Sequence, residues 1–436
     1  MAKALATDLY ELTMMAGYYA THHAGLATFE LFSRHLPPGR SLLIAAGLEQ
    51  ALDYLEALRF DRDEIDYLRG LPQLAGVPAS FFDTYLPRFR FTGEVWAIAE
   101  GTPVFPPEPI LRVTARLPEA QLVETALLAI ISFQTSIASK AFRVVHAAQG
   151  RPVVEFGARR AHGLDAALLV SRATYLAGCD STSYTEGGLR FGVPVSGTMA
   201  HSWVMSFADE IEAFREYVGV FGERTVLLVD TYDTLAAVDR LIAAGLTPAA
   251  VRLDSGDLVG LSRAARRKLD AAGLASTKIF VSGDLDEHKI ADMLAQGAPM
   301  DGFGVGAALS TSIDAPSLGA VYKLVEVERD GRLVGVAKRS PDKQTLPGRK
   351  QVWRRTTGHV ADGDLVTVDD EVAPAGAIPL LQRVMVNGRR EQPTRAIEDL
   401  RQHCRDATAH MPATLLGLRD AAPYPVRFSD RLSLKT

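Results

Sequence analysis

The chain has 436 residues, 47% hydrophobic and 23% charged, which is typical of a globular protein with a large barrel or two or three domains. Its formal net charge of −5 gives no general electrostatic case for nucleic acid or an anionic membrane surface, so we expect neither as a partner. The two cysteines, Cys179 and Cys404, exclude a disulfide framework and a cysteine-rich zinc site.

The sequence also predicts a soluble, cytoplasmic protein. The segment TDLYELTMM near the start has no secretory apolar core. We expect no stretch apolar enough to span a bilayer, and the low cysteine content fits a reducing cytosol.

Residues 1–118 predict an N-terminal α/β domain without a regular alternation of strand and helix. Apolar spacing predicts helices at 8–20 and 47–57 and strands at 28–34, 91–99 and 110–114. A long apolar segment, 119–140, then predicts a helix that packs centrally.

From about residue 150 onward, short apolar runs that end in small or acidic residues alternate with amphipathic helices. The runs are VVEFG (153–157), GCDST (178–182), VPVSGT (193–198), VLLVDTYD (226–233), VRLDSGD (251–257), IFVSGD (279–284) and DGFGVG (301–306). Since no GxGxxG fingerprint follows the first run, this pattern favours an irregular α/β barrel over a doubly wound sheet. We place this barrel domain at 119–323.

The remaining residues, 324–436, predict mainly strands and a terminal helix. Asp330-Gly331 predicts a hairpin turn, and the basic stretch 338–355 is broken by Pro and Gly. We expect this segment to pack with residues 1–118 into a second, discontinuous α/β domain.

The segment SGTMAHSWVMSFAD (196–209) places His201 where a strand passes into a helix, with Ser202 as the predicted N-cap. Trp203 and Phe207 begin a helical apolar spacing behind it. In parallel α/β folds this junction faces the ligand. A histidine satisfied inside a loop is the alternative.

Two SGD turns and a glycine-rich strand end predict a site for an extended anionic ligand. VRLDSGD supplies Arg252 for anions, and Asp254 and Asp257 as carboxylates for Mg²⁺ or sugar hydroxyls. Capping of the next helix by the two acids is the alternative. The second SGD ends in Asp284, and the glycines of GFGVG allow close backbone approach to a phosphate.

The segment FGARRAH (156–162) combines an aromatic side chain with two arginines. Phe156 beside Arg159 and Arg160 suits a flat ring that bears a carboxylate. Arginines at the start of a solvated helix are the alternative.

Several enzyme classes lack their motifs here. In VLLVDTYD, Asp230 and Asp233 are separated by two residues, so the loop does not match that of type I phosphoribosyltransferases. The absence of HxH, HExxH, CxxC, GxSxG and GxxxxGK[ST] argues against zinc hydrolases, α/β hydrolases and P-loop enzymes.

Taken in order, TDLYELTM, FELFSR, EFGARRAHG, GTMAHSW, LVDTYDT, VRLDSGD, FGVG, PSLGAVYKLVEV and LPGRKQVWRR resemble the nicotinate phosphoribosyltransferase family over nearly the whole chain. The resemblance implies a type II phosphoribosyltransferase fold and a homodimer with active sites at the interface. It implies that nicotinate and 5-phosphoribosyl 1-diphosphate give nicotinate mononucleotide and pyrophosphate in NAD salvage, with Mg²⁺ and coupled ATP hydrolysis.

The resemblance also implies individual roles. ATP would transiently phosphorylate His201, and Asp254 would be the second catalytic residue. Nicotinate contacts are implied for Tyr10 (from the partner subunit), Phe156, Arg159, Thr198 and Arg252. Ribose, phosphate or diphosphate contacts are implied for Arg34, Asp257, Gly283, Asp284, Gly304, Gly306, Thr311, Lys323 and Lys343.

One segment departs from the family pattern: Tyr184–Gly188 replaces an Asn-Val-Leu-Ala-Gly-like stretch near the expected ring pocket. Selectivity between nicotinate and nicotinamide is therefore open, and a nicotinamide-specific relative is the first alternative, although Leu253 stands where that enzyme usually has Pro. A quinolinate phosphoribosyltransferase, a catalytically silent nucleotide-binding paralogue and a Mg²⁺-dependent barrel lyase are further alternatives.

Overall fold

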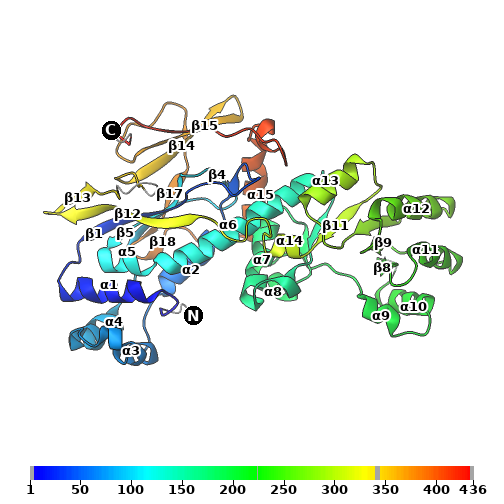
Figure 1. The fold of residues 1–436 in the computed structure, drawn as a ribbon, viewed down its shortest axis with the longest axis horizontal. Helices are drawn as coiled ribbons and strands as arrows, with labels where there is room; N and C mark the ends of the chain where they lie inside the picture. Colours follow the sequence, from blue (N-terminus) through cyan, green and yellow to red (C-terminus); the bar gives the residue numbers. More distant parts are fainter. Residues whose placement is uncertain (1–3, 223, 339–343, 433–436) are drawn as a thin grey trace. The chain divides into compact units, whose positions relative to one another are not determined.

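A computed structural model describes residues 4–222, 224–338 and 344–432, coloured along the chain in Figure 1. The chain forms two compact units. Unit 1 comprises Met1–Ser136 and Ser317–Thr436, and unit 2 comprises Ile137–Pro316. The domain limits inferred from the sequence, residues 118 and 323, stay a prediction.

Unit 1 is built on an antiparallel sheet that combines both ends of the chain. Its described strands are, in spatial order, β13 (Arg332–Gly335), β12 (Ala320–Arg329), β1 (Leu26–Ser33), β5 (Pro109–Arg116), β3 (Glu94–Ile98), β17 (Leu381–Val386) and β18 (Arg389–Arg390). The strands β1 and β12 pair directly although about 300 residues separate them, with Phe29 opposite Leu324. The discontinuous α/β organisation expected for this part of the chain is therefore present. Asp330-Gly331 forms the predicted hairpin turn, with both residues at positive φ.

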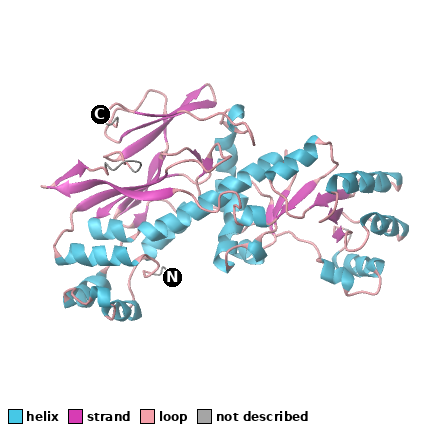
Figure 2. Cartoon of the chain, in the orientation of Figure 1, coloured by secondary structure: helices cyan, strands magenta, loops and turns pink. Residues whose placement is uncertain are grey.

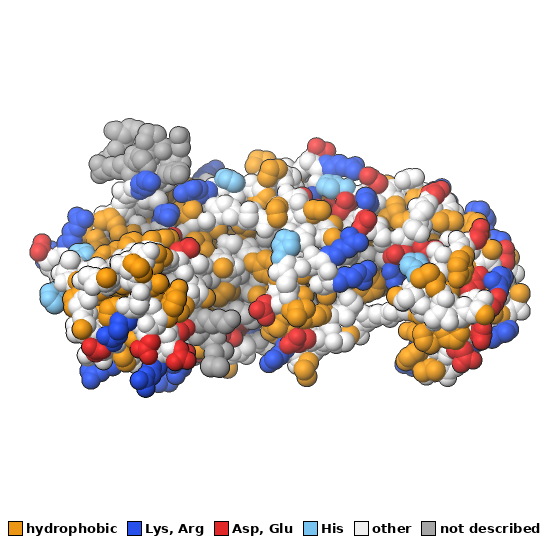
Figure 3. All heavy atoms as spheres, turned by 60° about the horizontal axis from the view of Figure 1, so that its bottom comes forward, with side chains coloured by type: hydrophobic (Ala, Val, Ile, Leu, Met, Phe, Trp, Pro, Cys, Tyr) orange, Lys and Arg blue, Asp and Glu red, His pale blue; other side chains and the backbone are white. Residues whose placement is uncertain are grey.

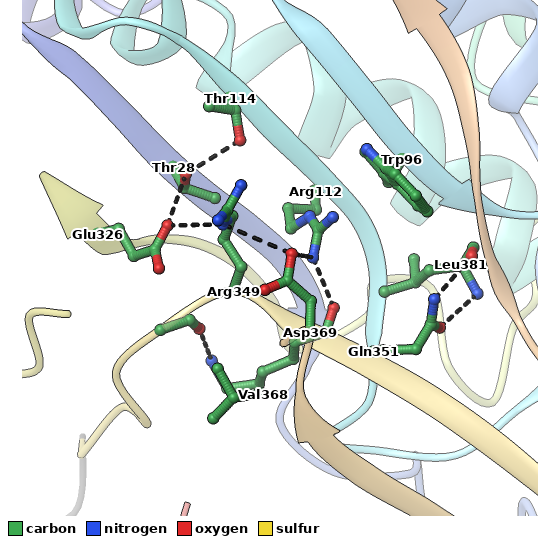
Figure 4. A network of polar contacts seen from close by, with 12 residues as sticks. Thr28, Trp96, Arg112, Thr114, Glu326, Arg349, Gln351, Val368, Asp369 and Leu381 are labelled. Atoms are coloured by element: carbon green, nitrogen blue, oxygen red, sulfur yellow. Dashed lines mark hydrogen bonds and ion pairs between the residues drawn. The ribbon is translucent and has the colours of Figure 1, made fainter. Parts of the chain in front are cut away.

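A second sheet packs in unit 1 through polar side chains as well as apolar ones. Its described strands lie in the order β16 (Ile378–Pro379), β14 (Lys350–Thr357), β15 (Val360–Val368) and β19 (Val426–Phe428). A separate two-stranded sheet pairs β2 (Leu43–Ile44) with β4 (Pro103–Val104). Figure 4 shows Arg112 of β5 directed at Asp369, which follows β15; Arg112 Nη1 lies 3.2 Å from Asp369 Oδ2. The same nitrogen donates to the Lys350 carbonyl oxygen at 2.9 Å. These contacts join the two sheets.

The helices of unit 1 largely follow the apolar spacing of the sequence. Those described are α1 (Leu9–Ala20), α2 (Leu48–Ala57), α3 (Arg62–Arg69), α4 (Leu86–Arg88), α5 (Leu117–Leu122) and α15 (Ile397–Ala409). The single helix predicted for 119–140 is wrong in its continuity: α5 ends at Leu122, and a separate helix, α6 (Glu124–Ala147), continues to residue 147.

Helix α6 also corrects the expectation that no segment is apolar enough to cross a membrane. It is long and apolar enough by length and composition, but 61% of its apolar window is buried inside the protein. A central core helix passes the same test, and its burial identifies α6 as one. The buried Lys140 of α6 supports this assignment, because its ammonium pairs with Glu287 Oε2 at 2.5 Å inside unit 2.

Unit 2 contains a parallel sheet whose strands follow chain order around a ring. Its described strands lie in the order β7 (Ser181–Thr182), β6 (Val153–Glu155), β11 (Gly302–Val305), β10 (Lys278–Val281), β9 (Ala250–Leu253) and β8 (Val226–Leu228). The last strand along the chain, β11, pairs with the first, β6, as in a closed barrel. The ring is interrupted between β7 and β8, so the predicted irregular α/β barrel is confirmed in the form of a half-barrel (Figure 2).

The interruption lies at VPVSGT, which is not the strand that the sequence predicted. Only Val195 makes an isolated bridge there, to Thr182. On the other side of the gap, the Thr198 hydroxyl donates a hydrogen bond to the carbonyl oxygen of Val226 in β8. Pro194 and the Ser196-Gly197 turn leave this segment too irregular for a regular ladder.

Helices follow most strands of unit 2. They are α7 (Leu164–Leu176), α8 (Thr185–Phe191), α9 (His201–Met205), α10 (Glu210–Phe221), α11 (Thr234–Ala243), α12 (Leu258–Ala271), α13 (Glu287–Ala295) and α14 (Ala307–Ser310). Four of them begin at an Asp whose carboxylate accepts backbone N–H groups of the first turn: Asp209, Asp233, Asp257 and Asp286. The face shown in Figure 3 carries acidic and basic side chains interspersed with one another.

Candidate active site

Two cavities lie at the carboxyl ends of the barrel strands of unit 2. The larger has a volume of about 410 Å³ and the smaller about 160 Å³. They adjoin, because the same four side chains line both: Phe156, Arg159, Arg252 and Asp254. Ligands of parallel α/β folds bind at this edge, so the two cavities form one candidate site with two compartments.

His201 lines the larger cavity from the first residue of α9. Ala200, not Ser202, is the N-cap of this helix, which corrects the prediction from the sequence. The imidazole Nδ1 lies 3.2 Å from Thr231 Oγ1, and Nε2 lies 3.8 Å from Asp254 Oδ2. The ring is 39% exposed, so it is held from two sides and still open to a ligand.

The helix behind His201 is shorter than its apolar spacing suggested. It ends at Met205, and α10 begins separately at Glu210 after its Asp209 cap. Trp203 still packs on both helices, since its Nε1 donates to the Ala213 carbonyl oxygen at 3.1 Å. The apolar residues that were predicted to form one helix therefore belong to two helices, α9 and α10, that pack against each other.

Arg252 and Asp254 form an ion pair at the end of β9. Arg252 Nη2 donates to Asp254 Oδ1 at 2.7 Å, and Arg252 Nε donates to Ser282 Oγ at 2.8 Å. The guanidinium carbon lies 5.5 Å from the centre of the Phe156 ring. The cation, its carboxylate and the aromatic ring therefore converge at the boundary of the two cavities.

The surroundings of Asp254 favour its charged form. Burial raises the pKa of this carboxyl, but hydrogen bonds from Ser282 and Arg252 outweigh burial and hold the pKa below its ordinary value. Asp230 fixes the turn that carries it: Asp230 Oδ2 accepts from the Asp254 backbone N–H at 3.0 Å and from the Ser255 hydroxyl at 2.7 Å. The half-buried carboxylate thus stands between Arg252 and His201 at neutral pH.

Phe156 depends on a glycine opposite it. A Cβ at position 304 would lie 2.5 Å from Cδ2 of Phe156, so only glycine leaves room for the ring. The preceding residue, Glu155, is fully buried and accepts from the Thr182 hydroxyl at 2.6 Å and from the Gly157 backbone N–H. Burial raises the pKa of Glu155. These contacts fix the strand end from which Phe156 and Arg159 reach the cavities.

The smaller cavity is lined by the second SGD turn and the glycines of β11. Gly283 has φ +101°, and a Cβ there would lie 2.0 Å from the Asp254 carbonyl oxygen, so the two SGD turns touch backbone to backbone. Asp284 is exposed and lies 3.5 Å from Arg160 Nη1. Gly304 and Gly306 complete this wall.

The structure brings together ten of the side chains and glycines predicted for the site. These are Phe156, Arg159, Thr198, His201, Arg252, Asp254, Gly283, Asp284, Gly304 and Gly306. Asp257 and Thr311 are not among the described residues that line the cavities: Asp257 caps α12, and the Thr311 hydroxyl donates to the Ala307 carbonyl oxygen at 2.8 Å. Their ligand contacts stay a prediction.

The remaining predicted residues belong to unit 1 or lie outside the described residues. Tyr10 is an exposed residue of α1, and Arg34 is exposed just after β1. Lys323 on β12 lies 3.9 Å from Glu124 Oε1. Lys343 falls outside the described residues. Roles for these four stay a prediction.

Sequence reasoning missed several groups of the site. Ser282 is buried between Arg252 and Asp254, Thr231 contacts His201, and Asp230 holds the first SGD turn. Each belongs to a run that the sequence had singled out, so its place at a strand end was the available signal. Which of them pointed inward depended on the turns.

The packing of α8 explains the segment Tyr184–Gly188, whose sequence differs from the family pattern. Residues 185–188 begin α8, where a Cβ on Gly187 would lie 2.2 Å from Ser171 Oγ and one on Gly188 2.4 Å from Val195 Cγ2. The neighbouring Ser183, not this helix, lines the larger cavity. The glycines therefore allow α8 to pack closely against α7 and the interrupted strand.

Comparison with known proteins gives consistent matches along the chain. Family models match residues 5–132 (the N-terminal domain of nicotinate phosphoribosyltransferase), 152–354 (the nicotinate phosphoribosyltransferase, or NAPRTase, family) and 371–435 (its C-terminal domain). The chain is 47% identical to nicotinate phosphoribosyltransferase pncB2 of Mycobacterium tuberculosis, over 98% of this chain and 92% of that protein. It is 44% identical to nicotinate phosphoribosyltransferase of Bacillus subtilis, over 84% and 76% of the two chains.

Solved structures show the same similarity. Human nicotinic acid phosphoribosyltransferase matches with a TM-score of 0.83 and 29% identity, covering 98% of both chains. Nicotinate-nucleotide pyrophosphorylase of Pyrococcus furiosus matches with a TM-score of 0.76 and 27% identity, covering 93% of this chain and 94% of that one.

Proposed function

The chain belongs to the nicotinate phosphoribosyltransferase family, an enzyme family of NAD biosynthesis, and from that premise we propose how its residues perform the reaction. Nicotinate and 5-phosphoribosyl 1-diphosphate give nicotinate mononucleotide and pyrophosphate. The observation that carries the assignment of roles is the pair of adjoining cavities that share Phe156, Arg159, Arg252 and Asp254.

The larger cavity receives nicotinate. Phe156 offers a flat apolar face, Arg252 and Arg159 supply positive charge for the carboxylate, and Thr198 also lines this cavity. Nicotinamide has the same ring without the charge, so it forgoes the charge-assisted hydrogen bonds that these arginines provide. This difference supports nicotinate as the preferred base.

The smaller cavity receives the phosphoribosyl group. Its glycines carry no side chain and so allow close approach of phosphate oxygens, and Arg159 and Arg160 also line this cavity. The two cavities adjoin, so the pyridine nitrogen in one faces the anomeric carbon in the other. The nitrogen–carbon bond forms as the bond to pyrophosphate breaks, and the site supplies orientation and charge stabilisation.

Mg²⁺ fits this site as a partner of the diphosphate. Among the described residues no cluster of three or more His, Cys, Asp or Glu side chains is arranged to hold a metal by itself. The buried Oδ1 of Asp230 has no hydrogen-bond partner in the structure, and a hard cation is a suitable partner for it. Asp230, together with substrate phosphates, would hold Mg²⁺, which neutralises the charge of the leaving pyrophosphate.

His201 accepts the γ-phosphoryl group of ATP. A ring nitrogen forms the bond to phosphorus while the bond to the β-phosphate oxygen breaks and ADP leaves; water later cleaves the phosphohistidine. The imidazole gains positive charge in the attack, and the Asp254 carboxylate 3.8 Å from Nε2 stabilises it. Thr231 holds the other ring nitrogen in place.

The family resemblance further supports a homodimer in which Tyr10 enters the partner's site. Leu9 and Tyr10 on α1 are exposed apolar residues, as are Met205, Val220 and Phe221 on and beside α9 and α10. Light scattering that gives the mass of one chain would contradict this assembly. A cytoplasmic location is consistent with two cysteines that are buried and form no disulfide.

The decisive assay measures pyrophosphate release from 5-phosphoribosyl 1-diphosphate and Mg²⁺. Nicotinate, nicotinamide and quinolinate are compared, each with and without ATP, for the wild type and His201→Ala. We expect turnover of nicotinate that ATP increases, with the increase lost in His201→Ala and kept in the control His359→Ala, an exposed histidine of unit 1. Turnover of nicotinamide or quinolinate instead, or nucleotide binding without turnover, would contradict the proposal.

A further inference from the structure

Ser282 occupies a buried position at the boundary of the two cavities. It follows β10 directly, is 2% exposed, and its backbone N–H donates to the Leu253 carbonyl oxygen at 2.9 Å. The position is rigid, because Gly283 beside it touches the backbone of Asp254. If the Ser282 hydroxyl is removed, a small shift of the strand end therefore cannot bring another polar group into its place.

The direction of both hydrogen bonds of this hydroxyl follows from its partners. Arg252 Nε can only donate, so Ser282 Oγ accepts at 2.8 Å. The single hydroxyl hydrogen is then free to be donated to Asp254 Oδ1, with which Ser282 Oγ is in hydrogen-bond contact. The hydroxyl thus bridges a pair that also shares a direct hydrogen bond: it accepts a hydrogen bond from the cation and donates one to the carboxylate.

This arrangement decides which polar groups face the ligand. Nε and Nη2 of Arg252 donate to Ser282 and Asp254. The nitrogen left for a ligand is therefore Nη1, which makes a long hydrogen bond of 3.4 Å to the Met199 carbonyl oxygen. Asp254 Oδ1 accepts two donors, which leaves Oδ2 directed toward His201.

We propose that Ser282 is a positioning residue that sets the orientation of Arg252 for the base and of Asp254 for His201 at once. The inference rests on the proposed roles of Arg252 and Asp254. Without the hydroxyl, the long Arg252 side chain loses its fixed Nε contact, and Asp254 keeps only one of its two side-chain donors. A single buried hydroxyl therefore couples base binding to the histidine step.

The test compares Ser282→Ala with the matched control Ser262→Ala. Ser262 is also a buried serine of unit 2, but its hydroxyl donates only to the Val259 carbonyl oxygen in its own helix, at 3.0 Å. We expect Ser282→Ala to raise KM for nicotinate about tenfold and to reduce the gain from ATP, because charge-assisted hydrogen bonds of this kind contribute at least that factor. Ser262→Ala should change neither, and Ser282→Thr, which keeps a hydroxyl, should lie closer to the wild type.

A comparison of KM with kcat separates positioning from general structural damage. Ser282 Oγ fixes Arg252 Nε, so its loss should raise KM for nicotinate more than it lowers kcat, whereas general damage would lower kcat and the free energy of unfolding together. Calorimetric binding of nicotinate to the free proteins should show the same weakening in Ser282→Ala without any turnover.

The outcomes distinguish the two hypotheses. If the wild type binds nicotinate without turning it over and Ser282→Ala weakens that binding, the proposed function fails and the positioning role stands. If the wild type is active and Ser282→Ala matches Ser262→Ala in KM, ATP gain and nicotinate binding, Ser282 has no positioning role.

Discussion

Two arginine–aspartate pairs, one in each unit, show how the same residue types serve different ends. In unit 1, Arg354 and Asp364 form a two-pronged pair, with Nε to Oδ1 at 3.0 Å and Nη2 to Oδ2 at 2.6 Å. In unit 2, Arg252 and Asp254 share one direct hydrogen bond at 2.7 Å. The side chains of the first pair are 7% and 0% exposed, and those of the second are 12% and 29% exposed.

The difference lies in what completes each pair. Arg354 also donates to the Pro103 carbonyl oxygen, and its guanidinium lies 5.6 and 5.7 Å from the ring centres of Phe105 and Tyr424. The Tyr424 hydroxyl donates to Asp364. The protein itself therefore satisfies the unit 1 pair, whereas Arg252 and Asp254 keep polar atoms directed at a cavity. A closed pair stabilises the fold, and an open pair binds a ligand.

The largest effect should come from breaking the closed pair. Arg354→Ala leaves the buried Asp364 without its cation, and we expect the free energy of unfolding to fall by about 3–5 kcal/mol. Denaturant titration measures the loss. Arg383→Ala, which removes an exposed pair with Glu391, should change stability little. Equal losses in the two variants would show that the closed pair contributes no more to stability than an exposed pair.

Breaking the open pair should affect activity in place of stability. Arg252→Ala should lower kcat/KM for nicotinate about 100-fold, because the charge-assisted contact to the carboxylate is lost. Its free energy of unfolding should stay within about 1 kcal/mol of the wild type, since solvent can reach the remaining carboxylate. Steady-state kinetics and denaturant titration on the same preparation measure kcat/KM and the free energy of unfolding. A large loss of stability would show that Arg252 and Asp254 form a structural pair like Arg354 and Asp364.

A smaller effect is expected from crowding the aromatic wall beside the open pair. In Gly304→Ala the added methyl group would lie 2.5 Å from the Phe156 ring, so the ring must move out of its place over Arg252. We expect KM for nicotinate to rise about tenfold with a smaller change in kcat. Gly219→Ala on α10, where a Cβ meets nothing within 4 Å, is the control. An unchanged KM would show that Phe156 does not stack on the base.

The smallest effect concerns Asp257, which has both a structural and a proposed ligand role. Asp257→Ala removes the cap of α12 and should cost about 1 kcal/mol of unfolding free energy, whereas Asp257→Asn keeps a cap acceptor and should cost less. If Asp257 also contacts ribose or phosphate, KM for 5-phosphoribosyl 1-diphosphate should rise in both variants. A rise in neither would leave Asp257 as a capping residue only.

The sequence by itself determined the succession of elements and the ligand edge. The alternation of β/α units from residue 150 onward is local, since each unit buries its own apolar run and exposes its polar strand end. That pattern correctly placed Phe156, Arg252 and Asp254 at strand ends of one sheet, and His201 reaches the same cavity from the start of α9. The motif resemblance then identified the family, which the comparisons confirmed.

Only the tertiary structure decided where the local pattern fails. The apolar run at 193–198 reads as a strand, but no neighbour completes a ladder there and the barrel stays open at that point. The helix predicted for 119–140 breaks at Val123, and the apolar α6 proves to be a core helix because other elements cover it.

The tertiary structure also decided which polar residues work together. Arg252 and Ser282 lie 30 residues apart, and His201 and Thr231 likewise, so no spacing in the sequence links them. The residue types alone do not distinguish Arg354 and Asp364 from Arg252 and Asp254. Burial and hydrogen-bond geometry separate a structural ion pair from a binding one, and both arise only when distant strands pack side by side.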